Sequence, residues 1–188
     1  MVGKVEIANM ALDFIGKSPI QSFTEESSSA ELINRSYDKA RTDLLQSYEW
    51  SFAKGVEELA ASTVDPVDTK WAYSFQVPSD YLKMIKLVGI DKNTEWERQG
   101  QSIYINSSEL TIVYLKNLQD STKFSSQFDT ALAYLIASRI AYPATKKREL
   151  MQDMLQGFIM ASSMARGTDG GERQLENNIG HSFLDARN

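Results

Sequence analysis

Apolar residues recur every three or four positions in two stretches near the N-terminus, which is the period of an amphipathic helix. The first stretch covers about residues 3–16, and Gly16 followed by Pro19 predicts its end. The second begins at a predicted capping box, Ser28-Ser-Ala-Glu31, and continues for about twenty residues to the region of Trp50. Two helices are therefore expected before the hydrophobic period changes.

From Trp50 to about Leu115 the hydrophobic period changes from 3.6 to 2, which is typical of half-buried strands. Trp50 and Phe52 already alternate with smaller residues, and two of the later segments flank Gly100 as in a β-hairpin. We expect a small, mostly antiparallel sheet of about four to six strands. The clearest predicted strands are residues 71–77, 82–88, 94–98, 102–106 and 110–115.

The helical period returns after Lys123. Residues 131–141 are apolar around most of the helix circumference, so this helix should be buried on more than one side. Pro143 is expected to end it, and a fourth, methionine-rich helix should run from Lys146 to about Arg166. Methionines in such a helix usually fill a core and less often form an adaptable docking surface.

The last residues, 168–188, form a glycine-rich and polar tail that is not expected to pack in a domain of its own. Four apolar residues interrupt it, which a purely solvated tail would not need. We interpret the tail as an arm that orders against a partner, and the alternative is a loose end with incidental apolar residues. The four residues are Leu175, Ile179, Phe183 and Leu184.

Taken together, the pattern predicts an α+β protein: a four-helix bundle with an inserted, mostly antiparallel β-sheet and an extended C-terminal arm. The bundle would comprise residues 1–49 and 120–167, the inserted β domain residues 50–119, and the arm residues 168–188.

Composition then removes most common chemistries. The 188 residues contain no cysteine and a single histidine, His181, which excludes disulfides and thiolate sites and disfavours a Ser-His-Asp triad or a multi-histidine zinc site. The net charge of −5 disfavours a general nucleic-acid binder. No secretory signal and no long apolar run is present, so we expect a soluble protein made in a cytoplasm. No G-x-G-x-x-G, Walker, G-x-S-x-G or H-E-x-x-H motif occurs, so we expect no cofactor, no metal and no enzymatic activity.

Paired carboxylates are the remaining candidate for catalysis, because glycoside hydrolysis uses two of them. Glu57 and Glu58 are adjacent in a predicted strand and must point to opposite sides, whereas Glu95 and Glu97 could share a face. An exposed strand face is the favoured interpretation of the second pair. A carboxylate-dependent carbohydrate hydrolase is the alternative function.

Four passages carry a family resemblance: Leu44–Phe52, where Trp and Phe follow a long helix; Tyr73–Leu82, with its Val-Pro-Ser-Asp turn; Glu97–Ile105; and Phe124–Pro143, with its Phe-x₃-Phe-x₂-Ala-Leu-Ala opening. On these residues the chain resembles the podophage tail tubular protein A family of head-to-tail adaptors, also called gatekeepers. The resemblance covers about residues 5–167, and it departs from the family at Val77, where leucine is usual.

The resemblance implies a virion structural protein that forms a dodecameric ring below the portal vertex. Such a ring joins the portal protein to the tail nozzle protein (tail tubular protein B) and forms part of the channel through which genomic DNA passes without sequence-specific binding. It also implies that the C-terminal arm grips the portal and that tail fibres attach near the junction. The hydrolase alternative would be an enzyme of the phage tail.

A ring of identical copies needs two different contact patches on each copy. The helix over residues 128–141 is apolar on several faces and could contact both the core and a neighbouring copy. Arg139, alone among apolar residues, is either a snorkelling side chain or one half of an ion pair across a subunit boundary. The expected interface residues are Phe128, Ala133, Ala137 and Arg139.

Overall fold

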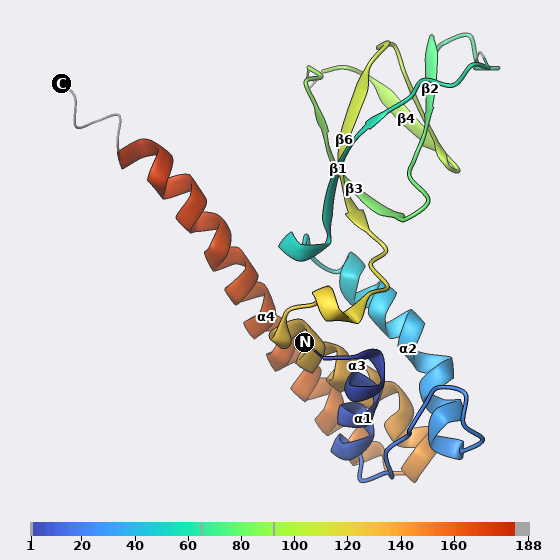
Figure 1. Ribbon diagram of the computed structural model, residues 1–188, viewed down its shortest axis with the longest axis vertical. Helices are drawn as coiled ribbons and strands as arrows, with labels where there is room; N and C mark the ends of the chain where they lie inside the picture. The colour runs from blue at the N-terminus through green and yellow to red at the C-terminus, as the bar shows by residue number, and fades with distance from the viewer. Residues whose placement is uncertain (1, 65, 92, 183–188) are drawn as a thin grey trace. The chain divides into compact units, whose positions relative to one another are not determined.

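Figure 1 shows a computed structural model of the chain, which describes residues 2–64, 66–91 and 93–182, with the side chains of the last helix described up to Gly171. The chain divides into two compact units. One combines Met1–Phe52 with Gln119–Asn188 and is helical, and the other is Ala53–Leu118 and is built of strands. The predicted α+β class is confirmed.

The helical unit contains α1 (Lys4–Phe14), α2 (Ser28–Gln46), α3 (Ser126–Thr145) and α4 (Arg148–Ser182), and the short 3-10 turn η2 (Ser121–Lys123) precedes α3. α3 is the central element, because α1, α2 and α4 all pack against it. Eleven of its residues are buried, on every side of the helix. The prediction that this helix is buried on more than one side is confirmed.

Local hydrogen bonds define the ends of α1. The Glu6 carboxylate accepts a hydrogen bond from the Gly3 N–H at 2.6 Å and so stabilises the first turn. At the other end Gly16 adopts the left-handed conformation with φ +67°, and Lys17 donates its N–H to the carbonyl of Leu12 at 3.0 Å. This is a Schellman arrangement, and it confirms Gly16 as the terminating residue.

The predicted capping box at the start of α2 is wrong by one residue. Ser27, not Ser28, is the N-cap, and its hydroxyl accepts the Ala30 N–H at 3.1 Å. Glu31 is therefore too far along the helix to complete the box and pairs instead with Arg35, at 3.1 Å. Three consecutive serines offered three registers, and only the fold selects one of them.

Pro143 does not end α3, which continues to Thr145. A proline removes only its own N–H, and the following residues still bond backward. Lys146 donates its N–H to the carbonyl of Tyr142 at 2.8 Å and ends the helix in a left-handed conformation with φ 60°.

Trp50 and Phe52 do not begin a strand, contrary to the sequence prediction. The chain forms a 3-10 turn, η1 (Ser51–Ala53), and the Trp50 ring is fully buried in the helical unit. It meets Phe128 at 5.1 Å between ring centroids, and Phe52 lies 5.9 Å from Phe124. Aromatic packing therefore outweighs the two-residue period at this point.

The strand unit contains two three-stranded antiparallel sheets in the described residues, where the sequence predicted one. The first has the order β1-β6-β3 and the second β2-β5-β4. The predicted hairpin around Gly100 is confirmed, with φ +58° at the glycine. The strands are β1 (Lys54–Leu59), β2 (Tyr73–Gln76), β3 (Tyr81–Val88), β4 (Trp96–Gln99), β5 (Ser102–Ile105) and β6 (Leu110–Lys116).

The strand unit has its own core. Buried side chains from both sheets form one cluster, and Phe75, Ile103 and Ile105 are each at most 1% exposed. The other buried members are Leu59, Val77, Leu110, Ile112 and Tyr114.

α4 continues well beyond the predicted end near Arg166 and reaches Ser182, so the backbone of the predicted arm is helical up to that residue (Figure 1). Gly167, Gly170 and Gly171 all keep helical rather than left-handed backbone angles. The Asp169 carboxylate holds this part of the helix by accepting the Ser51 N–H at 2.8 Å. A tertiary contact therefore supports the helix where its sequence favours it least.

Candidate interaction surface

α4 is fixed against α3 by close packing at one glycine. A Cβ placed on Gly157 would lie 2.6 Å from the Tyr134 ring of α3, so a larger residue would have to displace that ring. The Tyr134 ring in turn stacks on Phe14 of α1, with 4.2 Å between centroids. Ser162 and Ala165 of α4 are buried as well.

The other sides of α4 expose four large apolar side chains. Leu155 is 46% exposed, Ile159 59%, Met160 63% and Met164 69%. No charged residue occurs between Met154 and Ala165. A helix that faces only water normally carries charged residues on its outer face, so this composition makes the exposed sides of α4 a candidate interaction surface.

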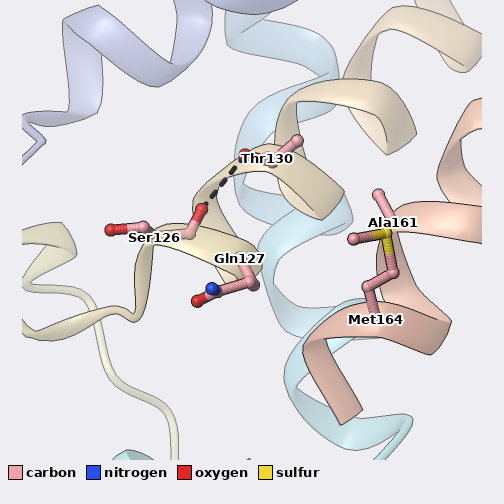
Figure 2. Close-up of a pocket in the computed structure, with 5 residues that line it drawn as sticks. All are labelled: Ser126, Gln127, Thr130, Ala161 and Met164. Carbon is pink, nitrogen blue, oxygen red and sulfur yellow. Dashed lines mark hydrogen bonds between the residues drawn. The ribbon is translucent and has the colours of Figure 1, made fainter. Parts of the chain in front are cut away.

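A hollow of about 210 Å³ opens beside Met164, between α4 and the first turns of α3. Figure 2 shows Ser126, Gln127 and Thr130 of α3 on one side of it and Ala161 and Met164 of α4 on the other. The Thr130 hydroxyl already donates to the carbonyl of Ser126 at 3.1 Å. Because this donor is satisfied within α3, an apolar side chain could enter the hollow without leaving it unpaired.

The predicted subunit interface on α3 is wrong for three of its four residues. Phe128, Ala133 and Ala137 are each 0% exposed inside the helical unit. A side chain that the subunit's own helices cover completely cannot contact a neighbouring copy. α3 is apolar all round because three helices of the same chain surround it.

Arg139 fits neither of the two alternatives considered for it. Its guanidinium donates to Asp43 of α2 at 2.7 Å, within the same chain, and both side chains are about one-third exposed. Burial opposes ionisation of Asp43, but hydrogen bonds from Lys39 and Arg139 outweigh it and lower the pKa of this carboxyl. The pair therefore links α2 to α3 rather than one subunit to another.

The predicted partner-binding residues fall at the end of α4. Leu175 and Ile179 belong to its last turns, and Phe183 and Leu184 lie outside the described residues. Their contact with a portal stays a prediction. His181 is also part of the helix backbone.

The paired carboxylates are engaged separately. Glu95 forms an ion pair with Lys70 at 3.1 Å, and Glu97 accepts a hydrogen bond from the Gln99 amide at 3.1 Å. Glu57 accepts a hydrogen bond from the Tyr114 hydroxyl at 3.2 Å. Each of these three carboxylates therefore has a partner of its own, and Glu57 and Glu58 both line a hollow of about 540 Å³ in the strand unit.

Sequence reasoning missed the buried carboxyl of Asp129, which is 3% exposed at the start of α3. Burial raises its pKa to about 7. One of its oxygens has no hydrogen-bond partner in the structure. The available signal was a lone acid near the first turn of a helix that is otherwise apolar all round.

Among the described residues, no group of three or more acidic or histidine side chains is arranged to hold a metal ion. Their helices also include none long and apolar enough to cross a membrane. No protein-family model matches the chain, and no curated protein matches its sequence.

Proposed function

We propose that this protein is a phage head-to-tail adaptor, a virion structural protein that forms a dodecameric ring between the portal protein and the tail nozzle protein. The observation that carries the proposal is the ordered set of four passages that resemble the tail tubular protein A family. Phe124–Pro143, the most specific of them, supplies nearly all of the central helix α3.

The other passages fall at junctions of the fold. Leu44–Phe52 leads from α2 to the strand unit, Tyr73–Leu82 covers β2 and the turn into β3, and Glu97–Ile105 is the β4–β5 hairpin. A resemblance at these positions concerns the framework rather than a catalytic site. It therefore supports a shared architecture, and the structural role is proposed by analogy with that family.

The charge supports a channel in which DNA slides. A protein that neutralises many phosphates binds DNA tightly by releasing counterions. Each copy of this chain carries a net charge of −5, so a ring of copies would present an acidic body to the genome. DNA would pass through it without sequence-specific binding.

In this proposal the end of α4 and the residues after it bind the portal, the nozzle protein binds the opposite end of the ring, and tail fibres attach near that junction. The ring lies in the virion below the portal vertex after synthesis in the host cytoplasm. The hydrolase alternative is not proposed, because Glu95 and Glu97 are both exposed, whereas the catalytic acid of such a pair needs a sheltered site.

The decisive experiment mixes the purified chain with the portal of the same phage and images the product by electron microscopy. We expect a ring of this protein stacked on the portal. Portal particles that look the same with and without the chain would overturn the proposal.

A set of substitutions tests whether the arm makes the portal contact. Replacing Leu175, Ile179, Phe183 and Leu184 together by serine should abolish portal binding measured by sedimentation. The matched control replaces the polar neighbours Gln174, Asn177 and Asn178 by serine and should leave binding intact. Equal binding by both variants would contradict a role for the apolar residues.

A further inference from the structure

α4 carries two rows of exposed residues on different sides of the same helix. One row, called here the basic row, consists of Arg148, Leu155, Ile159 and Arg166. The other, called the acidic row, consists of Glu149, Asp153, Met160 and Met164. All eight residues are exposed.

The rows point in different directions. Leu155 and Met160 are five residues apart, as are Ile159 and Met164, and at 3.6 residues per turn this separation is about 140° around the helix axis. The two apolar pairs therefore cannot belong to one patch. The polar face between them contains Gln152, Gln156 and Ser163.

The rows are complementary in charge and in shape. Arginines flank the apolar pair of the basic row, whereas two carboxylates precede the methionines of the acidic row. The hollow beside Met164, about 210 Å³, is on the acidic side. A cavity of about 150 Å³ accepts a benzene-sized group, so this hollow is large enough for one aliphatic side chain.

We infer that α4 is the contact between copies of this chain, with the basic row of one copy packed on the acidic row and hollow of the next. Leu155 and Ile159 of one copy cover Met160 and Met164 of its neighbour, and Arg148 faces Glu149 and Asp153. A contact between two different patches repeats from copy to copy and closes into a ring when the rotation allows. The inferred contact deepens the proposed function and rests on it for ring closure.

The register agrees with rotational symmetry. When the rotation axis runs along α4, neighbouring α4 helices are parallel and residues of equal number lie at equal height. Arg148 is then level with Glu149, and Ile159 with Met160. One charged pair and one apolar pair therefore meet without a shift along the helix, and Leu155 and Met164 follow one turn to either side of that apolar pair.

The occupant is a second copy rather than a nucleic acid or a lipid surface. Both of those ligands require clustered lysines and arginines, and the central twelve residues of this surface carry none. An unrelated protein would not account for two complementary rows on one helix. A copy of the chain supplies both.

The test uses the absence of cysteine from the chain, which gives thiol cross-linking a clean background. Ile159→Cys and Met164→Cys are prepared as separate variants, one with a mass tag, and treated with a short bismaleimide at several hundred micromolar protein. We expect the mixture to form tagged–untagged heterodimers at least five times more abundantly than either variant forms homodimers. The fully exposed Val67→Cys sets the background.

A charge exchange tests the register. Asp153→Arg added to the Met164→Cys variant should reduce the heterodimer yield several-fold, and Arg148→Glu added to the Ile159→Cys variant should restore it. Far-ultraviolet circular dichroism checks that each variant folds. The control pair of variants keeps the charged residues of both rows and carries Lys86→Glu in the strand unit.

Two results would overturn the inference: homodimers as abundant as heterodimers, which indicates a symmetric contact, or heterodimers at background with and without portal present. Neither result bears on portal binding, which is measured separately with the arm variants. Conversely, a strong heterodimer signal with no portal binding would retain the contact and remove the adaptor function.

Discussion

Gly157 is the residue on which the position of α4 depends most directly. Its missing side chain makes room for the Tyr134 ring, and that ring is held from the other side by stacking on Phe14. Elsewhere on the same helix a glycine has no such neighbour. A Cβ on Gly167 would meet nothing within 4 Å.

Gly157→Ala should therefore lower the free energy of unfolding by about 1–3 kcal/mol, because overpacking outweighs the gain in helix propensity. Gly167→Ala is the matched control and should raise it by up to about 1 kcal/mol. Urea denaturation followed by circular dichroism measures both. Equal stabilisation by the two changes would mean that Tyr134 moves aside freely.

Asp129 gives the stability of the helical unit a pH dependence. Its pKa is about 7 in the folded chain because of burial, whereas an unfolded aspartate titrates near pH 4. Between these values the folded state binds more protons than the unfolded state. The free energy of unfolding should therefore fall as the pH rises from about 4 to about 7.

Asp129→Asn should remove this fall and stabilise the protein by about 1–2 kcal/mol at pH 8. Asp120→Asn is the control. Hydrogen bonds from Thr122 lower the pKa of Asp120, so its removal should leave the fall between pH 4 and 7 in place. Denaturant midpoints at a series of pH values would show the difference, and a wild-type curve that is flat over this range would refute the assignment.

At the scale of elements, α4 is much longer than its partner. Its 35 residues span about 52 Å, whereas the 20 residues of α3 span about 30 Å. The two helices run antiparallel after a short connection, so the last turns of α4 extend past α3 (Figure 1). Asp169, bound to Ser51, is the anchor nearest to this extension.

Asp169→Ala should accelerate hydrogen exchange in residues 170–182, because it removes that anchor beside a glycine-rich stretch. Exchange in residues 148–165 should stay unchanged. Gly171→Ala meets no neighbouring atom and should slow exchange in the same final turns. Mass spectrometry of peptides resolves the two segments, and identical exchange in all three proteins would contradict an anchoring role.

The elements that the sequence predicted well are those with a strong local signal. α1 ends at a glycine that needs a positive φ, and the β4–β5 hairpin turns at another. The extension of α4 could not be predicted, because a cost of about 1 kcal/mol per glycine is offset by a contact between residues 118 positions apart.

The prediction of interface residues on α3 was wrong for a related reason. A helix that is apolar all round shows that it is covered, but not whether its own chain or another covers it. Phe128 and Ala133 are covered by the same chain. The exposed methionines of α4 looked like core filler, and only the fold separates Met160 and Met164 from the buried side of that helix.

At the scale of the molecule, the two units have separate cores and should unfold separately. Ile103→Ala in the strand unit and Leu132→Ala in α3 each remove a fully buried side chain and should each cost about 2–5 kcal/mol. We expect two calorimetric transitions, with each variant lowering only one. A single transition that both variants lower equally would show that the units unfold together.

The aromatic contact between Phe52 and Phe124 has a consequence for how such a chain can change. These rings flank the point where residues 53–118 leave and rejoin the helical unit, and their centroids are 5.9 Å apart. The helical unit thus packs its own side chains together at the point where residues 53–118 are inserted. Loop-closure entropy grows only with the logarithm of the length of the inserted segment. The junction should therefore accept a shorter, longer or unrelated inserted domain, which makes it a suitable site for grafting one.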